Sequence, residues 1–581
     1  MVKSTDIHLQ FASYFPDESI WPFIYSLSKK IEEGNICLDI KDINLDNLPD
    51  ALNTKKINYD ALESSPLIGR KDNLNYPFIL DHERLYLQRY YKYETIIVEK
   101  IKDIIKKDVN FISDKVEFLK SNIEHFLRSF QVNTEENNWQ FVACVLAYIH
   151  QFFILTGGPG TGKTTTVATM IQWMLMENIE LRIGLTAPTG KAAVRMAESL
   201  ANAATKMSES LQLKIRELEP QTLHRLLGTQ RDSIYFKYNS DNYLPYDVLI
   251  VDECSMVDTA LFAKFISAIG PETKVVLLGD KNQLASVEAG SIFGDLCKIR
   301  PVNNYYSKTI TDLFSIYFKQ NIPISQNENS VLIDHITELE KSHRFNSEKG
   351  IGKLSKAVIE NDVILLNTFM EIPKLENEVT IDLIYSKSIF ESFIASYSEY
   401  IKEPSIFDAL HKLESLRVLC AVRDGKYGTI AKNIEIRDYL IREGLLSRST
   451  DNEFYENRPI IVTQNNYDLK LYNGDIGIIR HGKAWFPDNT LPEKIRSVNP
   501  ALIASLDTVF AMTIHKSQGS EFAEVLIVLP MNDQRQLLTR ELIYTGVTRA
   551  KEKVIVQSDP TIFLQSCALR VDRVSGMKDR I

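Results

Sequence analysis

The segment from Gly157 to Thr164 has the spacing of a phosphate-binding loop, GxxxxGK[ST]. It follows an apolar run at 152–155 and precedes a plausible helix over 164–176. A glycine-rich backbone can turn its N–H groups toward phosphate oxygens, and the helix that follows adds partial positive charge at its first turn. The sequence therefore predicts that the chain binds a nucleoside triphosphate.

Two side chains of this loop have separate expected roles. Lys163 can reach the β- and γ-phosphates, and the Thr164 hydroxyl can hold Mg²⁺. The alternative is a glycine-rich turn that carries Lys-Thr by chance, but the strand before it and the helix after it argue against that reading. The loop residues expected to contact the nucleotide are Gly157, Gly158, Pro159, Gly160, Thr161, Gly162, Lys163, Thr164 and Thr165.

An apolar strand over 247–252 delivers two adjacent carboxylates to its end. Asp252 is placed to hold Mg²⁺, and Glu253 is placed to polarise the attacking water as a general base. Asp-Glu after a strand is weak evidence alone, and it gains its meaning from the phosphate loop upstream. The next apolar run leads to Gln283, which is expected to sense the γ-phosphate; the alternative is a polar residue of a surface loop.

Two arginines from the second half of the chain could complete this site. They are Arg344 and Arg549. An arginine brought across a cleft would stabilise charge on the transferring phosphoryl group. Taken singly, each is more typical of a surface ion pair. If both lobes contribute ligands to one nucleotide, its binding closes the cleft and its hydrolysis opens it.

Alternating apolar runs and helical segments must position these residues. In open α/β sheets, ligands bind at the carboxyl ends of the strands, and each predicted strand ends where polar residues begin. A small β insertion is predicted between about 450 and 510, where short strand-like pieces surround an Asn-Gly turn. The predicted strands are 152–156, 181–187, 247–252 and 274–279 in a first pattern, and 418–422, 459–464, 525–530 and 553–557 in a second.

Two other regions carry no nucleotide chemistry. Within residues 1–115, helical spacing from Leu85 to Ile97 predicts a helix whose tyrosines pack in a core, or alternatively a surface that docks a partner. The stretch 301–330 is polar and rich in Asn and Ser, which predicts a surface excursion.

The amino-acid composition limits which class of protein this chain can belong to. The 581 residues suffice for about three or four domains, and 44% hydrophobic and 25% charged residues are typical of a globular chain. A net charge of −9 is not that of a chain that coats nucleic acid, although a local basic channel is compatible with it. Six scattered cysteines without a CxxC pair predict a reducing, cytoplasmic location without structural zinc. We find no apolar run long enough to span a membrane.

Further motifs, in the right order, make the chain similar to superfamily 1 helicases. Gln140 precedes the phosphate loop at the distance expected of an adenine-contacting glutamine. Within that superfamily, the runs 84–90, 284–290 and 471–477 resemble the RecD family, the α subunits of bacterial exodeoxyribonuclease V (RecBCD) complexes. The superfamily motifs lie at 187–193, 222–228, 252–256, 279–284, 513–522 and 544–550.

The resemblance implies an α/β fold with two RecA-like P-loop NTPase domains, each with a parallel sheet. It also implies a mainly helical N-terminal domain and a small SH3-like β insertion in the second motor domain. The expected organisation is a partner-docking domain over 1–115, a first motor domain over 116–345, a second over 346–581, and the insertion at about 450–510.

The resemblance also implies an ATP- and Mg²⁺-dependent 5′→3′ motor on single-stranded DNA that processes double-strand ends for recombinational repair. The expected partners are the β and γ subunits, with the nuclease centre in the β subunit. Thr189, Lys191, Thr222, His224, Thr513, His515, Lys516 and Ser517 are the expected DNA contacts. Without the motifs, His224 and His515 read as core histidines. The expected catalytic set is Lys163, Glu253, Gln283, Arg344 and Arg549.

Small departures from the family pattern occur at Cys254, His343 and Gly546, and none removes a charged or phosphate-contacting group. Two further hypotheses remain. The chain could be a structural or regulatory subunit whose ATPase has decayed, against which the intact site residues argue. It could also be a stand-alone or RNA-directed helicase, but the longer N-terminal extension expected of stand-alone relatives is not apparent.

Overall fold

Parallel strands that are buried on both faces form the centre of the first lobe, as their near-continuous apolar runs require. The computed structural model describes residues 6–43, 48–53, 58–122, 124, 137–205, 207–230, 233, 235–299, 304–326, 330–372, 377–447, 453–466, 468–488, 491, 493–531, 537–571 and 573–581. Within this described part, every helix lacks the length and apolarity needed to cross a membrane.

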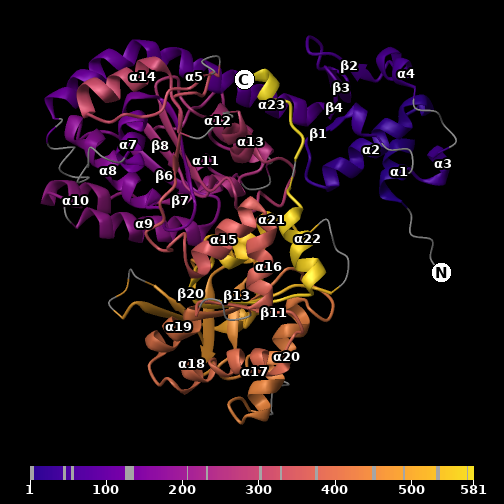
Figure 1. Ribbon diagram of the computed structural model, residues 1–581, viewed down its shortest axis with the longest axis vertical. Helices are drawn as coiled ribbons and strands as arrows, with labels where there is room; N and C mark the ends of the chain where they lie inside the picture. The colour runs from indigo at the N-terminus through magenta and orange to yellow at the C-terminus, as the bar shows by residue number, and fades with distance from the viewer. Residues whose placement is uncertain are drawn as a thin grey trace.

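The first lobe contains a six-stranded sheet in the order β10-β5-β9-β8-β6-β7, with helices on both sides (Figure 1). All its pairings are parallel, which confirms the first α/β pattern. The strands are β5 (Phe152–Gly157), β6 (Ile183–Ala187), β7 (Gln221–Thr222), β8 (Val248–Val251), β9 (Lys274–Gly279) and β10 (Ile336–Leu339). The helices are α7 (Trp139–Ile149), α8 (Lys163–Glu177), α9 (Gly190–Ala204), α10 (Glu209–Arg216), α11 (Leu223–Leu227), α12 (Thr259–Ser267), α13 (Ile292–Lys298) and α14 (Lys308–Leu313).

The second lobe repeats this architecture with a five-stranded parallel sheet in the order β11-β20-β19-β12-β18. Its strands are β11 (Val379–Asp382), β12 (Leu416–Cys420), β18 (Ala511–Thr513), β19 (Phe522–Val528) and β20 (Ala550–Gln557). Its helices are α15 (Gly350–Glu360), α16 (Val363–Glu371), α17 (Lys387–Ala395), α18 (Ser398–Lys402), α19 (Ile406–Ser415), α20 (Thr429–Arg442), α21 (Arg540–Val547) and α22 (Pro560–Ala568).

An antiparallel five-stranded sheet, in the order β16-β15-β14-β13-β17, forms the predicted insertion. The assignment of 459–464 to the second parallel sheet was wrong, because β13 pairs antiparallel with β14 and β17 inside the insertion. An apolar run alone does not identify its neighbours, and β18 takes the edge position in the parallel sheet. The strands are β13 (Pro459–Val462), β14 (Ile476–Arg480), β15 (Lys483–Pro487), β16 (Ile495–Val498) and β17 (Leu506–Thr508).

The N-terminal region contains helices packed on a four-stranded sheet, β1-β4-β3-β2, that the sequence did not predict. The helix expected from Leu85 begins only at Gln88, because Leu85 and Leu87 lie on β4 and pair with β3. Tyr86, Tyr90 and Tyr91 are buried, as the core interpretation of this stretch predicted. The elements are α1 (Ile7–Ser13), α2 (Trp21–Glu32), β1 (Cys37–Asp39), α3 (Asp50–Asn53), α4 (Tyr59–Ser64), β2 (Ile68–Gly69), β3 (Phe78–Asp81) and β4 (Arg84–Leu87).

The long helix α5 (Gln88–Ser121) joins this region to the first lobe and runs through residue 115. Ile97 and Ile101 belong to the same buried cluster as Phe152 on β5, so α5 completes one face of the first sheet. The other end of the chain returns to the same helix. After α22, the chain runs back to α23 (Met577–Arg580), which lies beside α5 (Figure 1).

The stretch 301–330 is not the surface excursion that its polar composition predicted. In its described part, Tyr306, Phe314 and Phe318 are buried in the core under the first sheet. Phe314 and Phe318 lie on a short π-helical turn (Phe314–Phe318) after α14, and Phe318 packs on Phe141 of α7. A few large aromatic side chains therefore bury this stretch, although its average composition is polar.

Candidate functional site

The phosphate loop lies between β5 and α8 and is enclosed by the side chains around it. Gly160 and Gly162 have φ angles of 75° and 86°, a region that favours glycine. A Cβ atom at Gly162 would lie 2.2 Å from Nε2 of Gln140, and one at Gly160 would lie 2.3 Å from Cβ of Arg344. The loop therefore needs glycine for its conformation and for the close approach of both neighbours.

Lys163 lies inside this loop. Its Nζ donates to the carbonyl oxygens of Gly157 at 2.6 Å and Gly158 at 3.1 Å. Gln140 supports the loop from outside, since its Nε2 donates to the Thr161 carbonyl at 3.0 Å. The Thr161 hydroxyl is used within the loop, donating to Gly158 at 2.8 Å. The arrangement leaves an ammonium group and the first turn of α8 available to anionic oxygens.

Two carboxylates follow β8, as predicted, and differ in their surroundings. Burial, and then the neighbouring Glu253 carboxylate, raises the pKa of Asp252 to about 6, while Lys163 acts in the opposite direction. Asp252 accepts a hydrogen bond from the Glu253 N–H at 2.8 Å, and Glu253 has a left-handed φ of 51°. Two crowded, half-buried carboxylates near Lys163, with the half-buried Thr164 following that lysine, offer oxygen donors suited to a hard divalent cation.

Gln283 lies at the carboxyl end of the neighbouring strand β9 and is only 6% exposed. Its Nε2 donates to Oδ2 of Asp280 at 3.1 Å, and its Oε1 has no hydrogen-bond partner among the described residues. Tyr544 of α21 donates to the same Asp280 oxygen at 3.1 Å. Asp280 therefore links the two lobes. Sequence reasoning missed this carboxylate, although its place directly after a strand is the signal that identified Asp252.

Arg549 reaches this junction from the second lobe. It is 3% exposed, and its guanidinium donates to the carbonyl oxygens of Thr545 at 3.1 Å and Ser520 at 3.2 Å. Burial lowers the pKa of Arg549, and the carboxylates of Glu253, Glu521 and Asp280 oppose that shift. Two of those carboxylates, Glu253 and Asp280, belong to the first lobe, so the guanidinium lies near the residues that follow β8 and β9.

Arg344 occupies the other side of the loop. Its Nη2 donates to Oε1 of Glu521 at 2.5 Å, and its Nη1 is buried without a partner among the described residues. Burial would raise the pKa of Glu521, but the guanidinium groups of Arg344 and Arg195 lower it to about 2. Sequence reasoning assigned no role to Glu521. Its signal is an acidic residue inside the 513–522 motif.

The predicted DNA contacts Thr189, Thr222 and Thr513 follow or end strands β6, β7 and β18. Each hydroxyl oxygen accepts a backbone N–H three residues ahead, at 3.2, 3.3 and 3.2 Å respectively. Each hydroxyl hydrogen thus remains able to donate to a phosphate oxygen. All three hydroxyls lie at or just beyond the carboxyl end of a strand, which is the arrangement expected of a backbone-tracking surface.

The remaining predicted DNA contacts differ in exposure. His224 and Lys516 are exposed, and His515 is half-buried. Ser517 is fully buried and donates its hydroxyl to the Ile514 carbonyl at 2.7 Å, so its side chain does not face a groove. Burial lowers the pKa of Lys191 to about 8, and Nζ of Lys191 lies 3.9 Å from Glu414 of the second lobe.

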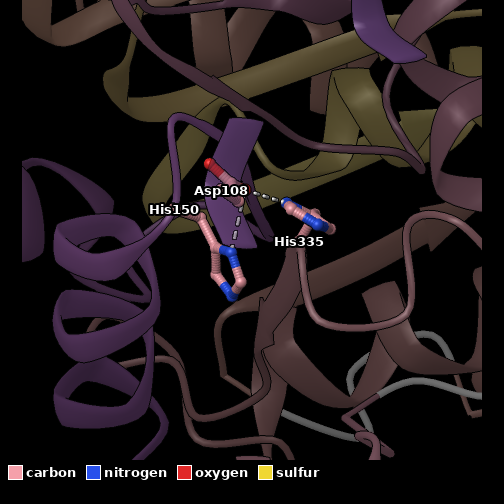
Figure 2. Close-up of side chains that lie close together, drawn as sticks. All are labelled: Asp108, His150 and His335. Atoms are coloured by element: carbon pink, nitrogen blue, oxygen red, sulfur yellow. Dashed lines mark hydrogen bonds and ion pairs between the residues drawn. The ribbon is translucent and has the colours of Figure 1, made fainter. Parts of the chain in front are cut away.

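A second polar cluster lies at the opposite end of β5 (Figure 2). Nδ1 of His150 lies 3.0 Å and Nδ1 of His335 lies 3.6 Å from Oδ2 of Asp108 on α5. This trio has the composition of a metal site among the described residues. However, the His335 Nδ1 donates to the Phe152 carbonyl at 2.8 Å, and the Lys274 ammonium is bound to carbonyls beside it. Because the Lys274 cation lies beside the trio and Nδ1 of His335 is already hydrogen-bonded, we interpret the trio as a structural anchor for α5 and not as a metal site.

Comparisons with known proteins add to this geometry. Residues 140–289 match the AAA domain family, and residues 508–557 match the UvrD-like helicase C-terminal domain family. The chain is 35% identical to RecBCD enzyme subunit RecD of Haemophilus influenzae, covering 86% of this chain and 80% of that one. It is 31% identical to RecBCD enzyme subunit RecD of Mycobacterium tuberculosis, covering 97% and 92% of the two chains.

More distant similarities are found as well. ATP-dependent RecD2 DNA helicase of Deinococcus radiodurans is 27% identical, with 70% of this chain and 46% of that protein covered. Among solved structures, Bacteroides Pif1 bound to ssDNA matches with a TM-score of 0.37 and 15% identity, covering 79% of this chain and 94% of that one. A TM-score of this size does not establish a shared placement of domains.

Proposed function

The chain belongs to the RecD family of RecBCD enzyme subunits, and we propose that it is the 5′→3′ motor of such a complex. As a member of this family it is an ATP-dependent DNA helicase subunit. The proposal adds the direction of movement, the residues that carry out hydrolysis and the partners. It also places the nuclease centre in another subunit.

The junction of the two lobes carries this proposal. Asp280 of the first lobe accepts a hydrogen bond from Tyr544 of the second, and Arg549 lies near carboxylates of the first. A nucleotide held by the phosphate loop would therefore lie against both lobes. Such a site can convert a change in the nucleotide into a change in the angle between the lobes.

The proposed hydrolysis gives each of these side chains a separate role. Lys163 and the backbone of the loop would hold the β- and γ-phosphates, and Thr164 and Asp252 would hold Mg²⁺, which neutralises phosphate charge when bound. Glu253 would accept the proton of the attacking water while the bond from the γ-phosphorus to the bridging oxygen breaks. Arg344 and Arg549 would stabilise the charge that develops on the phosphoryl oxygens, with Gln283 beside them.

Movement along DNA would use alternating grips on the backbone. The hydroxyls of Thr189 and Thr222 belong to the first lobe and that of Thr513 to the second, so a strand bound to all three crosses both lobes. Exposed Lys516 and His224 add donors that position phosphates without reading sequence. Opening and closing of the nucleotide cleft would then shift the strand from one grip to the other.

The proposed setting is a heterotrimer that acts on double-strand DNA ends in the cytoplasm. The β and γ subunits are the proposed partners, and residues 1–115 are the proposed docking region. Two observations support this setting: the names of the relatives, and six cysteines that are all buried, free thiols.

Unwinding of DNA with a 5′ or a 3′ single-stranded tail tests the proposal. We expect ATP-dependent unwinding of the 5′-tailed duplex, none of the 3′-tailed duplex, and none of either with Lys163→Gln. Equal unwinding of both substrates would contradict the proposed direction. Unwinding by Lys163→Gln at the wild-type rate would contradict the assigned site.

A further inference from the structure

The end of the chain forms a strap that returns from the second lobe to the first. The strap is defined as residues 573–581, which follow α22 and end in α23 beside α5 (Figure 1). Its first residue, Arg573, contacts the segment 284–290 of the first lobe. This segment follows Gln283 directly, so Arg573 contacts a part of the chain that adjoins the predicted site of hydrolysis.

Arg573 holds this segment by its backbone. Its Nη2 donates to the Ser286 carbonyl at 2.7 Å, and its Nη1 lies 2.9 Å from the Glu288 carbonyl and 2.6 Å from the Gly290 carbonyl. Three carbonyl oxygens of one short segment thus converge on one guanidinium. Hydrogen bonds from a charged donor are stronger than neutral ones, and the planar fork fixes their directions.

The same segment contacts the second lobe at its beginning. The Leu284 N–H donates to the Thr545 hydroxyl at 3.0 Å, and the Leu284 carbonyl accepts from Nε2 of Gln518 at 2.9 Å. Thr545 also accepts from Arg549 through its carbonyl. The segment is therefore held at one end by the second lobe itself and at the other by the strap.

Close packing keeps Arg573 in place. A Cβ atom at Gly34 would lie 2.9 Å from the Arg573 guanidinium, so the N-terminal region meets it without a side chain between them. The Gly290 N–H donates to the Gly34 carbonyl at 2.8 Å, and the Val574 N–H donates to Oδ1 of Asn35 at 2.8 Å. Arg573 thus lies where the strap, the 284–290 segment and the N-terminal region meet.

The far end of the strap is fixed on α5. The Gly576 N–H donates to Oε2 of Glu94 at 3.0 Å, and Nη1 of Arg580 donates to Oε1 of the same carboxylate at 2.9 Å. Glu94 is fully buried, and a Cβ atom at Gly576 would lie 2.3 Å from the Tyr86 hydroxyl. Since α5 packs on the first lobe, this end does not move with the second lobe alone.

We propose that Arg573 is a positioning residue for ATP hydrolysis, which fixes the 284–290 segment and through it the neighbouring Gln283. The inference rests on the proposed function, because it needs Gln283 to lie at the γ-phosphate. Arg573 contacts no atom of the nucleotide site directly. It acts through the backbone between residues 284 and 290, so its loss changes the rate of hydrolysis more than the binding of ATP.

The test compares Arg573→Ala and Arg573→Lys with the wild type and with Arg570→Ala, which removes an exposed arginine just before the strap. ATP turnover with single-stranded DNA gives kcat and KM, and circular dichroism gives the melting temperature. We expect Arg573→Ala to lower kcat about tenfold with KM within about threefold of wild type. Arg573→Lys should recover only part of kcat, because one ammonium cannot replace a planar fork.

Three outcomes distinguish the possibilities. Wild-type kcat in Arg573→Ala, with or without a lower melting temperature, would overturn the positioning role. If Arg573→Ala does not fold, Arg573→Lys decides, since a reduced kcat at an unchanged melting temperature supports the role and a wild-type kcat overturns it. Absence of DNA-stimulated turnover in the wild type and in Arg570→Ala would instead contradict the proposed function on which the inference rests.

Discussion

Asp252 and Glu253 are adjacent in the chain, but their surroundings give them different chemistry. Asp252 is half-buried near Lys163, which acts to lower the raised pKa of its carboxyl group. Burial lowers the pKa of Arg549 of the second lobe, and the nearby Glu253 carboxylate acts to raise it. The Asp252 carboxylate thus interacts with Lys163 of the phosphate loop, and the Glu253 carboxylate interacts with Arg549 of the opposite lobe. This separation supports the assignment of Asp252 to the cation and Glu253 to the attacking water.

Replacing Glu253 by Gln tests that assignment. The amide keeps the volume but cannot accept the proton, so we expect turnover to fall on the order of 10²–10⁴-fold while ATP affinity stays within a few-fold of wild type. DNA-stimulated ATP hydrolysis and equilibrium binding of a fluorescent ATP analogue measure the two quantities. Glu371→Gln, an exposed position on α16, is the control. Wild-type turnover in Glu253→Gln would remove Glu253 from the role of base.

The pKa of Asp252 predicts how cation binding depends on pH. An acid whose pKa is raised to about 6 stays protonated below that pH, and a protonated carboxyl is a poor ligand for Mg²⁺. We therefore expect the Mg²⁺ concentration that gives half-maximal turnover to rise as pH falls from 7.5 to 5.5. In Asp252→Asn this rise should be absent beyond the part due to ATP itself. The same pH dependence in both proteins would exclude Asp252 as the titrating ligand.

At the scale of elements, the Asp108 cluster connects α5 to the base of the first sheet. Burial lowers the pKa of His150 to about 3, and burial together with His150 lowers that of His335 to about 3. In an unfolded chain, imidazoles take up protons as the pH falls below about 6.5. In the folded chain, His150 and His335 take up protons only near pH 3. Each imidazole therefore lowers the stability of the fold as pH falls through that window, and the raised pKa of Asp108 offsets part of this effect.

Thermal unfolding as a function of pH tests this role. Each imidazole contributes a slope of about 1.4 kcal/mol per pH unit within its window. We expect the melting temperature of the wild type to fall between pH 6.5 and 4.5, and His150→Asn to show a shallower fall. His411→Asn is the matched control, because His411 is exposed on α19. An equally steep fall in His150→Asn would show that acid sensitivity arises elsewhere.

The elements also show what the sequence could predict. Strands that end in reactive residues, such as β8 before Asp252, were predicted well because burial on both faces leaves continuous apolar runs. The apolar run of β13 was assigned to the wrong sheet, since register and neighbours depend on long-range pairing. Leu85 and Leu87 fit helical spacing and strand alternation alike, and only the partner strand β3 decides between them.

At the scale of the whole molecule, two features could not be predicted from local patterns. One is the return of the strap to the first lobe, where Arg573 reaches a segment 283 positions earlier in the chain, at Gly290. The other is α5, which leaves the N-terminal region and completes a face of the first sheet. Both join parts of the chain that a division at residues 115 and 345 separates. Motion between the lobes must therefore be accommodated within these connections.

The most direct test of a nucleotide shared between two lobes is Arg549→Ala, with ATP binding and ATP turnover measured on the same sample. The phosphate loop of the first lobe would still bind ATP, so we expect affinity within about fivefold of wild type and turnover reduced by about 10²-fold or more. Wild-type turnover in Arg549→Ala would mean that the second lobe adds nothing to hydrolysis, and would contradict the account.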